Sequence, residues 1–243
     1  MKRLVAQTRH ELLLVLRNGE QLLLTLGIPV LLLVFFSLID VLPTDTDEPV
    51  DFLAPGVLAL AVMSAAMVSL GIGTGFERSY HVLKRLGATP LGRPRLVAAK
   101  ALAVAAVEVL QFVVIIGVAV ALGWSPGDRD ATDWLGAVAA VLLGTAAFAG
   151  VGLTLAGRLR GEINLAAQNA LYLVLLLLGG MVIPVAELPS VLRTVAEVLP
   201  SGALADVLHG MLGNDRINPS SWPVLGGWAV GAPVLAATLF RWD

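Results

Sequence analysis

Long uninterrupted apolar runs constrain this chain more than any other feature. A helix of about 20 apolar residues crosses the ~30 Å hydrocarbon layer of a bilayer. Charged residues make up only 14% of the chain, against roughly 25% in an average soluble domain. Mean hydropathy is +0.86. We therefore predict an all-α integral membrane protein that forms a single domain over residues 1–243, with six transmembrane helices at 22–42, 52–75, 96–122, 134–156, 165–183 and 222–240.

Two further kinds of helix are predicted outside these spans. Leu4, Leu12 and Leu16 repeat at helical spacing between basic residues, so residues 1–19 read as an amphipathic helix that lies in the membrane interface. Between the fifth and sixth spans, the apolar pieces 191–199 and 203–212 have about ten residues each, too few to cross a bilayer. We expect these two pieces to form short external re-entrant or interfacial helices.

Lysine and arginine are distributed unevenly among the segments between the spans. Thirteen of the sixteen lie in residues 1–19, in the loop 77–100, in the loop around Arg158 and at the C-terminus. The remaining three, in the other loops, are Arg129, Arg193 and Arg216. Because basic loops stay on the cytoplasmic side, we expect a multi-pass membrane protein with both termini in the cytoplasm. Abundant Ala and the excess of Arg over Lys favour a GC-rich bacterial source, so the expected membrane is a bacterial plasma membrane.

Several kinds of chemistry are not expected of this chain. It has no cysteine, and its three histidines are far apart in sequence, so we expect no metal site. It has no Gly-Lys dipeptide, which a phosphate-binding P-loop requires. A membrane-embedded enzyme would need several convergent catalytic groups, which one intramembrane carboxylate, Glu108, does not supply. We therefore predict that the chain is not an enzyme, has no catalytic residues and binds no nucleic acid.

The densest positive charge lies in the stretch ERSYHVLKRLGATPLGRPRLVAAK, residues 77–100. Helical spacing places Tyr80, Leu83 and Leu86 on one face and a charged row of Glu77, His81 and Arg85 on another. Gly87 is suited to end such a helix, and Thr89-Pro90 then turns the chain. A solvated loop explains the charge alone. A short amphipathic helix with a stop at each end favours a contact surface.

Glu108 lies about a third of the way into the predicted span 96–122, and we expect Gln111, one turn later, on the same face. A carboxylate among Val, Ala and Leu costs several kcal/mol unless it is paired, neutralised or hydrated. One interpretation is that both side chains line a path for substrate or protons. The other is an interhelical hydrogen bond that holds the bundle together.

Three stretches of the chain resemble a known family, the type-2 permeases of ATP-binding-cassette exporters. This group includes bacterial drug and antibiotic efflux permeases of the daunorubicin-resistance type. The most specific stretch is FERSYHVLKRLGATPLGRPRLVAAK, which is similar to the family's glutamate-arginine, leucine-lysine-arginine-leucine and threonine-proline-leucine pattern. The other two are RHELLLVLRNGEQLLLTLGIPVLLLVFF and GGMVIPVAELPSVLRTVAEVLPSGALADVLHGML.

The resemblance implies a role for the loop between the second and third spans. It would contain a cytoplasmic coupling helix that contacts the ATP-binding subunit, and Lys100 would match a lysine common at the start of the third span. The sequence assigns nine residues to this contact region: Glu77, Arg78, Tyr80, Leu83, Lys84, Arg85, Leu86, Thr89 and Pro90. The substrate-path candidates remain Glu108 and Gln111.

The implied function is outward transport of a hydrophobic or amphipathic solute, driven by ATP hydrolysis in a separate subunit. The chain itself would bind no cofactor, because ATP and Mg²⁺ would belong to that subunit. A second permease copy or a paralogue, membrane lipids and a small hydrophobic solute would be the other partners. The alternative is a proton-coupled secondary transporter that uses Glu108. The substrate stays open among a drug, a lipid, a peptide and a glycan precursor.

Overall fold

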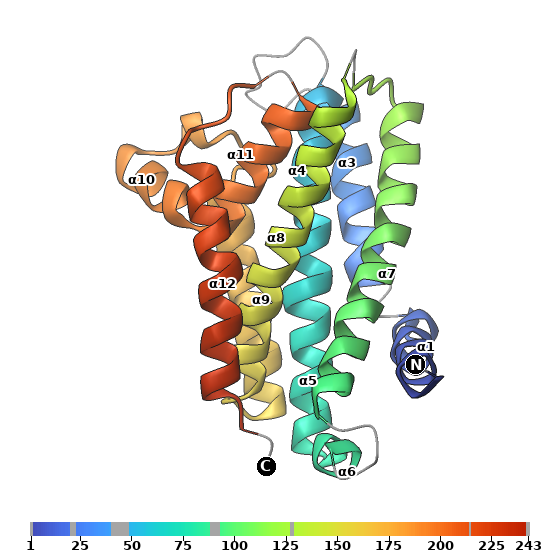
Figure 1. Cartoon of the computed structure of the whole chain (residues 1–243). Coiled ribbons are helices and arrows are strands. Elements are labelled where there is room, and N and C mark those ends of the chain that lie inside the picture. The colour runs from blue at the N-terminus through green and yellow to red at the C-terminus, as the bar shows by residue number, and fades with distance from the viewer. Residues whose placement is uncertain are drawn as a thin grey trace.

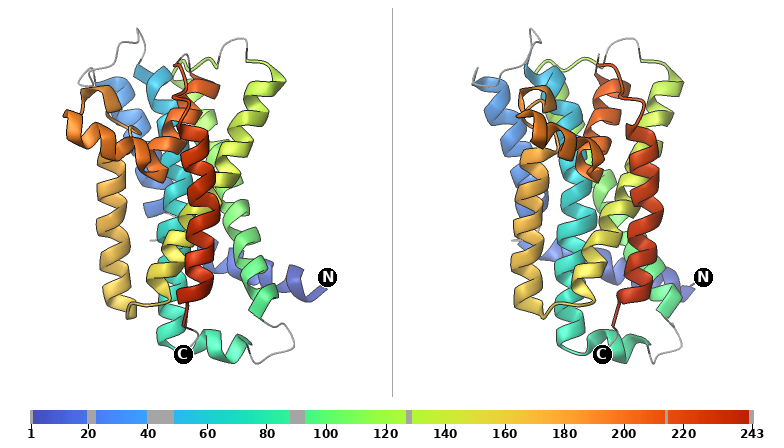
Figure 2. Two further views of the ribbon diagram at one scale, coloured as in Figure 1. Left: turned by 60° about the vertical axis from the view of Figure 1, so that its left-hand side comes forward. Right: turned by 90° about the vertical axis from the view of Figure 1, so that its left-hand side faces the viewer.

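The computed structural model describes residues 2–19, 23–39, 49–87, 93–126, 129–213 and 215–241, and in these ranges the chain contains helices and no strand. Most helices run nearly parallel in one bundle, and α1 lies across it (Figures 1 and 2). The α-helices are α1 (Lys2–Arg17), α3 (Ile28–Leu38), α4 (Pro49–Met63), α5 (Leu70–Ser79), α6 (Val82–Gly87), α7 (Arg93–Ala121), α8 (Ala131–Ala156), α9 (Gly161–Leu178), α10 (Ser190–Val198), α11 (Pro200–Leu212) and α12 (Ser221–Leu239). Two π-helical segments, η1 (Leu23–Gly27) and η2 (Ser64–Ser69), and one 3₁₀ turn, η3 (Val185–Glu187), complete the set.

Five helices are long and apolar enough to cross a membrane, which confirms the all-helical membrane architecture but not all six predicted spans. These helices are Pro49–Ser79, Arg95–Ala121, Ala131–Ala156, Gly161–Leu178 and Ser221–Leu239. The first predicted span, 22–42, corresponds to η1 and α3, which together measure about 24 Å at 1.5 Å per residue. The rest of that span lies partly outside the described residues.

α4, η2 and α5 form one continuous helix, Pro49–Ser79, at the centre of the bundle (Figure 1). In its most apolar window 83% of the residues are buried, against 17% in the corresponding window of α12. The outer helices α7, α8, α9 and α12 surround it, so their outward apolar faces are left for lipid. The central helix therefore carries the largest share of the core.

Small residues let α5, α8 and α9 approach closely. A Cβ added to Gly152 of α8 would lie 2.6 Å from the carbonyl oxygen of Met67 in η2. Amides complete the packing, because Asn164 of α9 donates to the carbonyl of Gly71 and Gln168 donates to that of Gly152, both at 2.9 Å. Backbone approach at small residues combined with side-chain hydrogen bonds is typical of helix association in membranes.

The two ends of the bundle differ. One end, called the α6 end below, contains α6, the α8–α9 connection and the C-terminal residues (Figure 1). The other, the α10–α11 end, contains α10, α11 and the α7–α8 connection. α8 begins there at Asp130, whose side chain accepts hydrogen bonds from the backbone N–H groups of Thr132 and Asp133. The hydroxyl of Thr132, together with these two N–H groups, holds the pKa of Asp130 below its usual value.

α10 and α11 correspond to the short helices predicted at 191–199 and 203–212. They meet at Leu199, whose extended backbone separates them. α11 is buried along most of its length, and His209 joins it to α4. The ring of His209 stacks on that of Phe52 at 4.5 Å, and its Nε2 lies 2.9 Å from the Phe52 carbonyl oxygen. α11 is thus part of the bundle core at this end.

Candidate functional site

The short helix α6 sits at one end of the bundle with one side packed and the other exposed. Leu83 is 1% exposed and packs against Leu96 of α7, with Leu86 and Phe240 beside them. Lys84 and Arg85 are exposed on the other side. The packed side fixes the position of α6, so its two positive charges are presented outward.

The predicted single face of Tyr80, Leu83 and Leu86 is wrong, because a turn interrupts the helix. α5 ends at Ser79, and His81 has a φ of 59°, in the left-handed region. Tyr80 is consequently 67% exposed while Leu83 is buried.

The same turn breaks the predicted charged row of Glu77, His81 and Arg85. Arg85 donates to the carbonyl of Tyr80 at 3.3 Å, and Glu77 points instead toward Lys100. Thr89 and Pro90, the last two predicted contact residues, lie outside the described residues.

The end of α5 is also attached to the α8–α9 connection. Nη2 of Arg78 donates to the carbonyl of Leu159 at 2.6 Å. The backbone N–H of Gly161 donates to Oγ of Ser79 at 3.0 Å. Arg78, predicted from the sequence as a contact residue, therefore also anchors α5 to its neighbour within the chain.

A buried ion cluster joins three helices near the α6 end, and we call it the Lys100 triad: Glu11 of α1, Glu77 of α5 and Lys100 of α7. Lys100 Nζ lies 2.9 Å from Glu11 Oε2 and 2.9 and 2.7 Å from the two oxygens of Glu77. Gln7 donates to the other oxygen of Glu11 at 2.8 Å. One ammonium group thus holds a carboxylate from each of two other helices.

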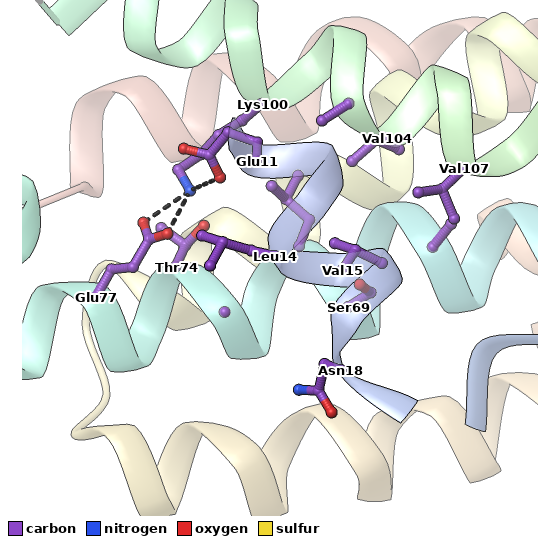
Figure 3. A pocket seen from close by; sticks show the side chains of 14 residues that line it. Glu11, Leu14, Val15, Asn18, Ser69, Thr74, Glu77, Lys100, Val104 and Val107 are labelled. Atoms are coloured by element: carbon purple, nitrogen blue, oxygen red, sulfur yellow. Dashed lines mark hydrogen bonds and ion pairs between the residues drawn. The ribbon is translucent and has the colours of Figure 1, made fainter. Parts of the chain in front are cut away.

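The triad forms part of the wall of a pocket of about 270 Å³ between α1, α5 and α7 (Figure 3). The remaining wall is mostly apolar, with Leu14 and Val15 from α1 and Val104 and Val107 from α7. Thr74, Gly73 and Ser69 contribute from the central helix. The pocket therefore combines a charged end with an apolar body.

Gln111 belongs to a second polar cluster, deeper in the bundle. It is buried, and its Nε2 donates to the Thr25 carbonyl of η1 at 2.6 Å and lies 3.5 Å from Oγ of Ser64 in η2. Ser64 Oγ also lies 3.4 Å from the Thr25 carbonyl. Both π-helical segments meet here, and such segments alter the regular pairing of backbone carbonyls. Gln111 supplies a donor for one of them.

Glu108 points to a different neighbour. It is 4% exposed, and both of its oxygens lie 2.9 Å from Oγ1 of Thr145 on α8. Oγ1 also lies 2.8 Å from the Val141 carbonyl. The contact agrees with the interhelical hydrogen bond that the sequence allowed. A role of Glu108 or Gln111 in a substrate path stays a prediction.

Sequence reasoning missed Glu11, Thr145 and Thr74 as members of these sites. Glu11 had a usable signal, because it is the single acidic residue in the basic helix α1 and lies one turn after Gln7. Thr145 and Thr74 had none, since a threonine in an apolar helix most often bonds its own backbone.

Comparison with known proteins identifies the family of the chain. No individual curated protein matches the chain closely enough to be compared with it. The profile of the ABC-2 type transporter family matches residues 3–211, from α1 to the end of α11. The match includes the three helices of the Lys100 triad, the polar cluster around Gln111 and the contact of Glu108 with Thr145. The chain belongs to the ABC-2 type transporter family.

Proposed function

We propose that this membrane subunit is the permease of an ATP-driven exporter for a hydrophobic or amphipathic solute, and that α6 is its coupling helix. Membership of the ABC-2 family supports the permease role. The segments that contain thirteen of the sixteen Lys and Arg residues lie toward the α6 end, which supports a cytoplasmic position for that end. A separate subunit would hold ATP and Mg²⁺, and a second permease copy or a paralogue would complete the transporter.

The position of α6 is the single observation that carries this proposal. Leu83 fixes the helix on Leu96 and Phe240, so α6 cannot move without moving its neighbours. Lys84 and Arg85 face outward, where an acidic surface of a partner would meet them. Packing on one side and exposed charge on the other is the arrangement that a contact helix requires.

A push on α6 has a defined route into the bundle. α6 follows α5 after a two-residue turn, and α5 is the end of the central helix. The Lys100 triad connects that end of α5 to α1 and α7. Displacement of α6 would therefore shift the central helix, the interfacial helix and α7 together, as a rocking mechanism needs.

Co-purification tests the proposed contact. The full chain is expressed in its native host and purified in mild detergent, and an ATP-binding-cassette subunit is sought by mass spectrometry. We expect Lys84→Glu to reduce its recovery at least tenfold, because a like charge meets the acidic surface. Arg216→Glu is the matched control, since it reverses one exposed charge at the α10–α11 end. Equal recovery in both variants, or no ATPase with the wild type, would overturn the proposal.

Transport separates ATP coupling from proton coupling. With the partner present, solute efflux from cells is measured after the partner's ATP site is inactivated, and separately after a protonophore collapses the proton gradient at constant ATP. We expect the first treatment to abolish efflux and the second to leave it. The opposite result would instead indicate a proton-coupled transporter.

A further inference from the structure

The pocket beside the Lys100 triad has properties that coupling does not explain. Its wall contains three charged residues, Glu11, Glu77 and Lys100. With both carboxyl groups ionised, two carboxylates and one ammonium give the pocket a net charge of −1. Glu11 and Lys100 are buried, and the side chain of Glu77 is 20% exposed. A buried carboxylate without a compensating cation is unfavourable, so the pocket has a deficit of one positive charge.

The geometry of the triad leaves acceptor capacity on Glu77. Both of its oxygens contact the same Lys100 Nζ, Oε1 at 2.9 Å and Oε2 at 2.7 Å. A carboxylate offers about four lone-pair positions, and one ammonium fills only part of them. Lone-pair positions on Glu77 therefore remain for a second N–H donor.

Thr74 is a second, independent sign of a missing partner. It is 3% exposed and lines the pocket beside Glu77, one turn before it on α5 (Figure 3). Its Oγ1 is buried and has no hydrogen-bond partner in the part of the chain that the structure describes. Buried hydroxyl groups are normally hydrogen-bonded. The unsatisfied hydroxyl and the excess negative charge therefore lie on the same wall.

The rest of the wall suits an apolar body. Leu14, Val15, Val104 and Val107 face the space that the charged end leaves open. Gly73 adds no side chain, and a Cβ built there meets no heavy atom within 4 Å. The volume of about 270 Å³ lies near the lower limit for small-molecule sites. A small occupant with one polar end fits this shape.

We propose that this pocket binds an amphipathic monocation, an ammonium group on an apolar body. The ammonium group donates to Glu77 and to Oγ1 of Thr74, and the body lies against Val104 and Val107. Binding of the cation neutralises the charge of the pocket. An anion would add to the negative charge, and a neutral solute would leave that charge unchanged. The cation comes either from a free amphiphilic amine or from an aminophospholipid headgroup. This names a solute class for the proposed exporter and rests on that proposal for its transport role.

Binding is tested on the full chain in phosphatidylglycerol nanodiscs, without the ATP-binding partner. The probe is 4-phenylbutylamine, followed by isothermal titration calorimetry at pH 7. Its neutral and anionic analogues are 4-phenylbutanol and 4-phenylbutyrate. We expect saturable binding of the amine with a stoichiometry of one, and at least tenfold weaker binding of the other two. Equal binding of all three probes would overturn the proposal.

Variants separate the pocket from partition into the bilayer. Gly73→Leu fills the pocket and replaces glycine by a better helix former, so the fold is retained. Gly117→Leu is the matched control, because Gly117 is an exposed glycine of α7 that also has open space around it. We expect Gly73→Leu and Glu77→Gln to weaken amine binding at least tenfold. We expect Gly117→Leu to leave the affinity unchanged. Unchanged binding in Gly73→Leu would contradict the site even where Glu77→Gln folds poorly.

Lipid composition identifies the source of the ammonium group. At constant phosphatidylglycerol content, exchanging phosphatidylcholine for phosphatidylethanolamine in mixed nanodiscs weakens amine binding if the primary ammonium headgroup competes for the pocket. Unaltered affinity assigns the pocket to a free amine. Either result leaves the ammonium site supported. Failure of amine binding with Lys84-dependent recovery of the ATPase intact would overturn this inference alone, and loss of that recovery would overturn the coupling proposal alone.

Discussion

Replacing Lys100 by methionine is expected to destabilise the protein by about 3–5 kcal/mol, the usual result of removing one partner from a buried ion pair. The side chains of Lys100, Glu11 and Glu77 are 10, 10 and 20% exposed, so solvent screens them little. Methionine fills a similar volume without a charge, and two carboxylates then face one pocket. The expected loss of stability therefore comes from electrostatics and not from packing.

A proton balance gives a similar magnitude. Without Lys100, one of the two carboxyl groups must be neutral in the folded state. Protonation of a glutamate with an ordinary pKa of about 4.3 costs about 3.7 kcal/mol at pH 7 and about 1 kcal/mol at pH 5. The unfolded chain releases that proton above a pH of about 4.3. The loss of stability of the variant relative to wild type therefore grows as pH rises from 5 to 7. The difference between variant and wild type is therefore expected to shrink in acid.

The assay is unfolding by sodium dodecyl sulfate in mixed micelles, at pH 5 and pH 7. Glu77→Gln is combined with Lys100→Met in a double-mutant cycle. We expect the second substitution to recover about half or more of the lost stability, because one of the two carboxylates is gone. A free energy of unfolding of Lys100→Met within about 1 kcal/mol of wild type at pH 7 would refute the predicted loss. A double variant with Glu77→Gln that is less stable than Lys100→Met alone would refute it as well.

Three other predictions use the same unfolding assay. Glu108→Gln keeps a hydrogen-bonding group beside Thr145 and is expected to change stability by less than about 1 kcal/mol, whereas Thr145→Val should cost about 1–3 kcal/mol because the buried carboxyl group loses its partner; equal effects would contradict this contact. Gly152→Ala places a Cβ 2.6 Å from the Met67 carbonyl and is expected to cost about 1–3 kcal/mol, while Gly226→Ala, which meets nothing within 4 Å, should cost nothing; a neutral Gly152→Ala would show that η2 yields easily. Leu83→Ala is expected to cost about 2–5 kcal/mol and to lower recovery of the ATPase, and Lys84→Glu to lower recovery without a loss of stability; retention of the ATPase by Leu83→Ala would separate α6 packing from the contact.

Hydropathy and charge predicted the helical membrane architecture because both signals are local. A run of apolar residues reports its own length, and the structure confirms five helices long enough to cross a membrane. The break at His81 was not predicted, because a non-glycine residue with φ of 59° leaves no sign in helical spacing.

Pairings between distant residues were beyond the sequence. Lys100 contacts Glu11 across 89 positions, and Glu108 contacts Thr145 across 37. Periodicity identifies which residues are unusual for an apolar helix, and it drew attention to Glu108 and Gln111. It does not identify the partner, since that depends on how the helices pack. The two residues share a helix, yet Glu108 faces α8 and Gln111 faces η1 and η2.

Under the proposed coupling, the central helix would act as a lever with unequal arms. η2 would be its pivot, because Ser64 and Gln111 tie this segment to η1. The arm from η2 to the end of α5 has 10 residues, about 15 Å, and the arm formed by α4 has 15 residues, about 22 Å. A rigid rod turned about η2 moves its far tip about 1.5 times as far as its α6 tip. Under the proposed coupling, a small stroke at α6 would be amplified most at the tip of α4, close to Phe52, where α4 meets His209.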